Sequence, residues 1–188
     1  MKNLICVSAP SGSGKTTLCK AIRKARPELI WSVSYTTRDP RPNEVNGEDY
    51  YFISKDKFIS LRDDKRLAEY ENVHGQYYGT IKSKLDAAIN NKKTVLLELD
   101  VNGTMSVRKL YPNHSYSIFI VPPSIEHLRK RLQSRGSETN EIIEKRLERF
   151  NKEMEYKDQF DTLLINDNIE VAINDFITTI NQITKGVN

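Results

Sequence analysis

Residues 9–18 of this 188-residue chain read Ala-Pro-Ser-Gly-Ser-Gly-Lys-Thr-Thr-Leu. They follow the apolar run Leu4–Val7 and precede a helix-like pattern, which predicts a strand, a glycine-rich turn and a helix. Glycines let successive N–H groups curl around an anion, and the following helix directs its positive dipole end at that anion. The stretch therefore predicts a phosphate-binding loop formed by Ala9, Pro10, Ser11, Gly12, Ser13, Gly14, Lys15, Thr16 and Thr17.

Two side chains of this loop have specific expected roles. We expect the Lys15 ammonium to reach the β- and γ-phosphates and the Thr16 hydroxyl to ligate Mg²⁺. The pattern Gly-x-x-x-x-Gly-Lys-Ser/Thr is met except at its first position, which is Ala9. The alternative is a Gly/Ser turn before an ordinary helix, and the Gly-Lys-Thr behind a strand disfavours it.

The length of 188 residues suits one well-buried α/β domain with a small insertion, and the composition suits a soluble globular chain. Hydrophobic residues make up 38% of the chain and charged residues 29%, which argues against disorder. No run approaches the ~20 apolar residues needed to cross a bilayer, and the chain leads directly into its first strand. Cys6 and Cys19 provide no disulfide or zinc framework. We therefore expect a cytoplasmic protein without membrane partners.

The net charge of +4 allows two interpretations, a nucleic-acid binder or an enzyme that holds several phosphates. The arginines are concentrated near residues 38–41 and 129–149, without a dense basic stripe or an aromatic platform. This distribution favours discrete phosphate contacts over a nucleic acid polymer.

Apolar runs and helical spacings alternate along most of the chain. Strands are predicted at 4–7, 29–34, 94–99, 116–121 and 162–165, and helices at 18–25, 81–89, 103–110, 124–135, 140–156 and 171–183. Such alternation indicates a parallel sheet covered on both faces.

Residues 34–80 interrupt this alternation with short strands and turn signals. Strands are predicted at 50–53 and 67–73, with a short helix at 55–61 that Ser54 caps. Asn46-Gly47 is a hairpin signal, and a further turn is expected at Gly75. We interpret this block as a subdomain inserted into the α/β core.

Several stretches, in order along the chain, resemble the guanylate kinase family: Ala9–Thr17, Ser34–Arg41, Glu44–Tyr50, Gly75–Thr80, Glu98–Asp100 and Arg135–Glu138. The resemblance implies an α/β P-loop nucleoside-monophosphate-kinase fold, with a parallel sheet core, an inserted small mixed GMP-binding subdomain and a helical lid. The implied divisions are a core of about 1–33, 81–125 and 157–188, a GMP-binding subdomain of about 34–80 and a lid of about 126–156. The implied reaction is transfer of the γ-phosphoryl group of ATP to GMP, with Mg²⁺.

The implied GMP-phosphate site consists of Arg38, Arg41, Tyr50 and Tyr78. Guanidinium groups are forked donors suited to bidentate phosphate contacts, and phenolic hydroxyls can donate to the same anion. The alternative for two loop arginines is a solvated surface.

Glu69 lies within the predicted strand 67–73 and, on alternation alone, reads as an outward-facing strand residue. The resemblance instead implies that its carboxylate meets the guanine base, with hydroxyl contacts from Ser34 and Thr80. Many relatives carry serine at the position of Thr80.

Asp100 follows the run 95–99, where a parallel strand meets its loop at the ligand edge of the sheet. A carboxylate there is expected to join the Mg²⁺ shell or to contact GMP. Glu98 stands where many relatives have aspartate, and alternation places it on the same side as Asp100.

Arg131 and Arg135 precede Gly136, and Arg146 follows in the next helix. Because phosphoryl transfer is catalysed mainly by positioning and charge neutralisation, the resemblance implies a closing lid with arginines directed inward. The segment shows no strong apolar stripe, and its alternative is a charged hairpin with solvated arginines, as expected for Arg129 and Arg149. Asn166 is the implied adenine contact.

The expected catalytic residues are Lys15, Arg38, Arg135 and Arg146, and the expected substrates are ATP and GMP. Two alternatives remain. A sugar-phosphate kinase on the same core would not need the set Glu69, Ser34 and Thr80. A catalytically inactive scaffold domain would not need an intact Gly14-Lys15-Thr16.

Overall fold

The computed structural model describes residues 2–10, 12–73, 75–134 and 139–185. Its core is a five-stranded sheet in the order β2-β7-β1-β8-β9, in which every neighbouring pair is parallel. The strands are β1 (Leu4–Ser8), β2 (Ile30–Trp31), β7 (Val95–Glu98), β8 (Ser115–Val121) and β9 (Thr162–Ile165). The parallel sheet predicted from the sequence is confirmed.

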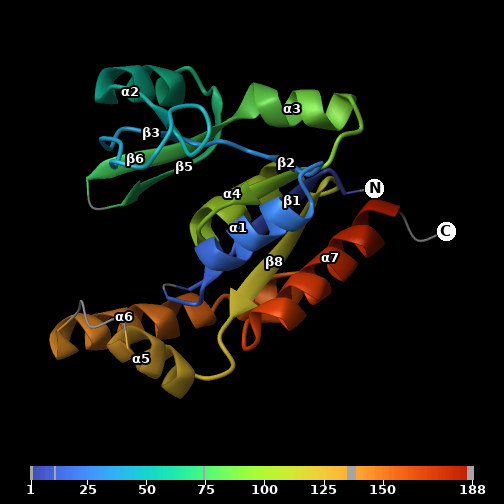
Figure 1. Ribbon diagram of the computed structural model, residues 1–188. Coiled ribbons are helices and arrows are strands. Elements are labelled where there is room, and N and C mark those ends of the chain that lie inside the picture. The colour runs from blue at the N-terminus through green and yellow to red at the C-terminus, as the bar shows by residue number, and fades with distance from the viewer. Residues whose placement is uncertain (1, 11, 74, 135–138, 186–188) are drawn as a thin grey trace.

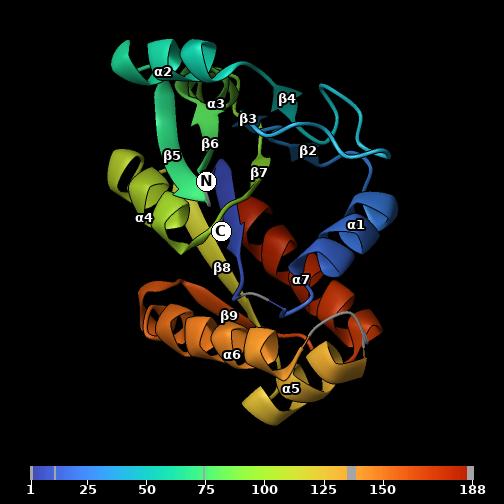
Figure 2. The same ribbon diagram turned by 90° about the vertical axis from the view of Figure 1, so that its left-hand side faces the viewer.

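Helices cover both faces of this sheet because its strands are apolar on both sides (Figure 2). On β1, Ile5 and Val7 pack in one cluster with α1 (Lys15–Ala25) and α7 (Ile169–Lys185). The alternate residues Leu4 and Cys6 pack in a second cluster with α3 (Lys82–Asn90) and α4 (Val101–Leu110). Alternation along a strand thus assigns each residue to one of two cores.

A second, mixed sheet has the order β4-β3-β6-β5. Its strands are β3 (Tyr35–Thr36), β4 (Tyr51–Phe52), β5 (Leu67–Val73) and β6 (Gln76–Ile81), and α2 (Lys55–Asp63) packs on it. Phe58 of α2 is fully buried and stacks on Tyr77 with ring centroids 5.3 Å apart.

Two sequence expectations in this region were wrong. The pattern assigned no strand to 76–81, which forms the antiparallel partner of β5. The strand expected at 29–34 is limited to Ile30–Trp31, because the chain then leaves the core sheet. Ser32 N still donates to Leu96 O (2.8 Å), whereas Ser34 O accepts from Tyr51 N (2.9 Å) beside the second sheet.

A helical hairpin of α5 (Ile125–Ser134) and α6 (Asn140–Met154) lies at the opposite end of the molecule from the mixed sheet (Figure 1). Its helices meet along buried residues Leu128, Leu132, Ile143, Leu147 and Phe150. The expectation that this segment lacks an apolar stripe was therefore wrong: the stripe is divided between two helices. The expected solvated arginines are ion-paired at the surface, Arg129 with Glu144 and Arg149 with Glu153.

The chain returns from this hairpin through the 3-10 turn η1 (Lys157–Gln159) to the edge strand β9. Within the described ranges, no helix is long and apolar enough to cross a membrane.

Candidate active site

A cavity of about 730 Å³ lies between the carboxyl ends of the core strands and the mixed sheet. Ten of the residues expected to bind substrates or metal line it: Lys15, Thr16, Ser34, Arg38, Arg41, Tyr50, Glu69, Tyr78, Glu98 and Asp100. These residues come from both sheets and from α1, so the fold brings together groups that are up to 85 residues apart in the sequence.

The predicted phosphate loop has the backbone that such a loop requires. Gly12 and Gly14 both have φ of 87°, in the left-handed region that favours glycine. Gly14 is the N-cap of α1, so the free N–H groups of the first helical turn adjoin the loop. The Lys15 ammonium donates to Leu99 O at 3.1 Å, and the exposed Thr16 lies in the same turn.

Arg38 is held by a carboxylate to which the sequence assigned no role. Its Nη1 and Nη2 each donate to Glu44 at 2.7 Å, and the backbone N–H of Arg41 donates to Glu44 Oε2 at 2.8 Å. The guanidinium also lies 5.2 Å from the ring centre of Tyr50. The hydrogen bonds from Arg38 lower the pKa of Glu44 to about 2 and raise the pKa of Arg38. The only sequence signal for Glu44 was its place in a stretch that resembles the family.

Tyr50 and Tyr78 lie beside this pair, with ring centroids 5.8 Å apart in an edge-on arrangement. Burial raises the pKa of Tyr50, which keeps its hydroxyl a hydrogen-bond donor near neutral pH.

Glu69 is buried, with only 7% of its surface exposed, so the outward orientation suggested by alternation alone is wrong. From this residue onward β5 alternates regularly: Glu69 and Glu71 line the cavity, whereas Tyr70 between them is exposed. Burial is the main cause that raises the pKa of Glu69 to about 7, and Asp100 and Glu71 add to it, while hydrogen bonds from Thr80 lower it. Beside it, Ser34 Oγ lies 3.5 Å from Thr80 Oγ1.

Glu98 and Asp100 both lie on the cavity wall, as expected, but each also has a structural partner. Glu98 Oε1 accepts from Arg23 Nη2 at 3.3 Å, and the Arg23 guanidinium lies over the Trp31 ring at 4.5 Å. Asp100 caps α4, its Oδ1 accepting from Gly103 N at 2.7 Å.

The remaining predicted residues that the structure describes are not part of the cavity lining. Arg131 donates to the backbone carbonyls of Asn166 (2.8 Å) and Asp167 (3.3 Å). The Asn166 side chain is buried and donates to Ser13 O at 2.8 Å. Ala9, Pro10, Gly12, Ser13, Gly14, Thr17, Thr80, Arg131, Arg146 and Asn166 make up this set. Ser11 and Arg135 lie outside the described residues.

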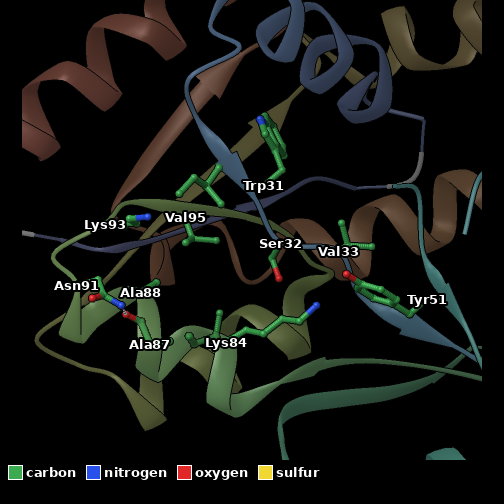
Figure 3. Close-up of a pocket in the computed structure, with 12 residues that line it drawn as sticks. Trp31, Ser32, Val33, Tyr51, Lys84, Ala87, Ala88, Asn91, Lys93 and Val95 are labelled. Atoms are coloured by element: carbon green, nitrogen blue, oxygen red, sulfur yellow. Dashed lines mark hydrogen bonds between the residues drawn. The ribbon is translucent and has the colours of Figure 1, made fainter. Parts of the chain in front are cut away.

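A second cavity of about 320 Å³ lies on the other side of the Ser32–Val33 connection, against α3 (Figure 3). The Lys84 side chain extends toward Tyr51, and its ammonium lies 3.9 Å from the centre of that ring. None of the predicted site residues lines this cavity.

The sequence and structure resemble those of known proteins. The family profile described as guanylate kinase matches residues 1–183. A guanylate kinase of Trichormus variabilis is 44% identical over 170 residues, which cover 90% of this chain and 85% of that protein. A guanylate kinase of Porphyromonas gingivalis is 40% identical over 189 residues, covering 100% and 97%.

Among solved structures, the guanylate kinase from Anaplasma phagocytophilum superposes with a TM-score of 0.77 at 26% identity, covering 96% of this chain and 85% of that one. A shikimate kinase from Bacteroides thetaiotaomicron, at 12% identity and a TM-score of 0.50, covers 95% and 98% and shares the fold alone. With the profile matched over nearly the whole length, the chain belongs to the guanylate kinase family.

Proposed function

We propose that this protein transfers the γ-phosphoryl group of ATP to GMP, giving ADP and GDP. One observation carries the proposal: a buried carboxylate, an arginine-tyrosine cluster and the lysine of a phosphate loop line one cavity. These groups suit, respectively, a guanine base, its 5′-phosphate and the phosphates of ATP. The names of the relatives support the same reaction.

Guanine is the base that fits Glu69. It offers two adjacent donors, N1–H and the 2-amino group, and an ionised carboxylate can accept from both. Ser34 and Thr80 add hydroxyl groups next to this carboxylate. A sugar-phosphate kinase would have no use for this arrangement, and an inactive scaffold would have no use for Lys15 at the cavity wall.

The GMP phosphate is assigned to Arg38, Arg41, Tyr50 and Tyr78. Held there, one phosphate oxygen forms a bond to the γ-phosphorus of ATP, while the bond from that phosphorus to the β,γ-bridging oxygen breaks. ADP leaves with the bridging oxygen, and no covalent enzyme intermediate is needed. Lys15 balances the negative charge that spreads over the transferring group.

Arg131, Arg135 and Arg146 are assigned to a lid that closes over ATP and excludes water. Because α5 and α6 share a buried seam, the hairpin would move as one unit. The domain division proposed from the sequence is kept: a core, a GMP-binding subdomain at about 34–80 and a lid at about 126–156.

The oxygen donors at the cavity suit Mg²⁺. Thr16 and Asp100 both line it, and hard cations prefer hydroxyl and carboxylate oxygens. Within the described residues, no group of three or more His, Cys, Asp or Glu side chains could hold a metal, so the proposal assigns the remaining ligands to phosphate oxygens and water. When bound, the ion neutralises charge on the β- and γ-phosphates.

The proposal also places the protein in the cytoplasm, with ATP and GMP as its partners and no nucleic acid polymer. Cys6 and Cys19 are buried free thiols, as is usual in a reducing compartment.

The test is ADP release from Mg·ATP with GMP, AMP, CMP or UMP as acceptor. Turnover with GMP is expected to exceed that with every other monophosphate by a wide margin. Equal turnover with AMP and GMP, or no GMP-dependent release, would overturn the proposal.

A further inference from the structure

The Asn166 side chain connects the end of β9 to the phosphate loop. Its Nδ2 donates to Ser13 O at 2.8 Å, across 153 positions of sequence. Asn166 and Ser13 are both buried, at 5% and 1% exposure. An amide donor used in this way is engaged with protein before any nucleotide binds, which differs from the adenine contact that the family resemblance implies.

The Ser13 carbonyl needs such a partner. A phosphate loop turns successive N–H groups toward the anion, which leaves carbonyl oxygens directed away from it into the protein. A buried carbonyl without a donor is unfavourable, so the loop holds this conformation only if the surrounding structure supplies one. Asn166 supplies it, and its amide packs so closely that a β-carbon at Gly14 would lie 2.4 Å from Nδ2.

The backbone of Asn166 is fixed on two further sides. Its N–H donates to Val121 O at the end of β8 (2.7 Å), and its carbonyl accepts from Arg131 of α5 (2.8 Å). Because the bond to Val121 lies at the edge of the core sheet, it holds Asn166 in place whatever position the hairpin that carries Arg131 takes.

We propose that Asn166 is a positioning residue of the phosphate loop. Its side chain holds the Ser13 carbonyl directed away from the bound anion, so that the N–H groups of the loop converge on the triphosphate. The inference rests on the proposed function only in naming ATP as the source of that triphosphate. Because the contact is with backbone, its effect on binding is independent of the base.

The chain provides a matched control in the same loop. Asn168 Oδ1 accepts from the N–H groups of Glu170 (2.9 Å) and Val171 (3.2 Å). Asn168→Asp keeps this acceptor, whereas Asn166→Asp loses the donor that Asn166 uses. Both substitutions add the same charge two residues apart. Asn166→Leu removes the donor without adding charge.

The experiment measures dissociation constants of Mg·ATP and Mg·tripolyphosphate by calorimetry, without GMP. Tripolyphosphate has the three phosphates of ATP but no base or sugar. The binding of tripolyphosphate that is lost in Lys15→Met is attributed to the phosphate loop. Asn166→Asp and Asn166→Leu are expected to raise the dissociation constants of both ligands by the same factor, about 10- to 100-fold, because each leaves the buried Ser13 carbonyl without its donor. Asn168→Asp should change neither by more than about 2-fold.

The unfolding temperature of each Asn166 variant is compared with that of Asn168→Asp, to verify that each variant is folded under the conditions of the binding measurements. Amide exchange of Gly12–Lys15 in the ligand-free protein should also accelerate in Asn166→Asp, a change that loss of an adenine contact would not cause. Weaker ATP binding with unchanged tripolyphosphate binding would overturn the inference in favour of an adenine contact, and unchanged binding of both would overturn it outright. Absence of GMP-dependent turnover in the unsubstituted protein would instead count against the proposed function.

Discussion

Glu69 and Gly103 lie in contact across the boundary between the two sheets: a β-carbon at residue 103 would stand 2.9 Å from Glu69 Oε2. Helix α4, which begins after Asp100, therefore passes directly under the carboxylate. Glycine at 103 leaves the space in which this carboxylate is held toward the cavity.

Glu69→Gln should lower kcat/KM for GMP by roughly 10²- to 10³-fold, because one of two charged hydrogen bonds to guanine is replaced by an opposing donor. The preference for GMP over AMP should narrow, and the affinity for ATP should stay the same. Steady-state kinetics with both acceptors measures this. Glu48→Gln, at an exposed position of the inserted loop, is the control. Full GMP selectivity in Glu69→Gln would mean that the base is read elsewhere.

Binding of GMP should depend on pH through Glu69. Its pKa of about 7 lies above the usual value of 4.5, so the empty site holds this carboxyl largely protonated below pH 7. Guanine needs the ionised form, so KM for GMP should rise as pH falls below 7, by up to about tenfold per unit, and level off above it. At pH 6, binding of GMP should therefore release a proton from Glu69, which calorimetry in two buffers of different ionisation enthalpy would measure.

The GMP phosphate titrates near the same pH, and Glu69→Gln separates the two contributions. In that variant the GMP phosphate is left as the titrating group of this pair, so the dependence of KM for GMP on pH should become shallower. The free energy of unfolding should also depend on this carboxyl. Between pH 4.5 and 7 the folded protein keeps a proton on Glu69 that the unfolded chain has lost, so the contribution of Glu69 to stability falls progressively as pH rises through this range. An unaltered profile in Glu69→Gln would assign the whole dependence to the ligand.

Glu44→Gln should raise KM for GMP by about 10-fold while leaving KM for ATP unchanged, because Arg38 loses one of the two charged bonds that orient it. Glu48→Gln again provides the matched control. The pKa of Glu44 is lowered to about 2, so its contribution to stability is complete above pH 4.5 and is lost as pH falls toward 2. A lower KM in Glu44→Gln would contradict this role and indicate that Glu44 competes with the phosphate.

Lys15→Met should keep the fold and lower turnover by at least ~10²-fold, the scale of one lost preorganised charge contact. In the described part of the chain the ammonium donates to the Leu99 carbonyl and forms no salt bridge, so its loss should change the unfolding temperature little. Turnover and thermal unfolding measured together test both statements. Near-normal turnover would remove Lys15 from the mechanism.

The sequence predicted local features well because neighbouring residues determine them. The strand, the glycine turn and the helix around Lys15 follow from residues within one stretch, and the structure places them as expected. The orientation of Glu69 could not be predicted from alternation, because alternation does not say which face of β5 lies on the cavity, and the pattern did not reveal the partner strand β6.

Pairings between distant or unassigned residues could not be predicted. The role of Glu44 depends on a turn that brings it back to Arg38, and the seam of the helical hairpin is divided between α5 and α6. Asn166 meets Ser13 only because β9 lies beside β8 at the edge of the core sheet. Such contacts depend on the three-dimensional arrangement of elements, which no single stretch contains.

The chain passes between the two sheets at two places, along Ser32–Val33 and where β6 runs into α3 at Ile81 and Lys82. Helix α4 also packs against β5, with Gly103 next to Glu69, so the mixed sheet is held to the core by packing as well as by the chain. A rotation of this sheet about its two connections would move the Glu69 carboxylate across the surface of α4, and the absence of a side chain at residue 103 leaves room for that movement.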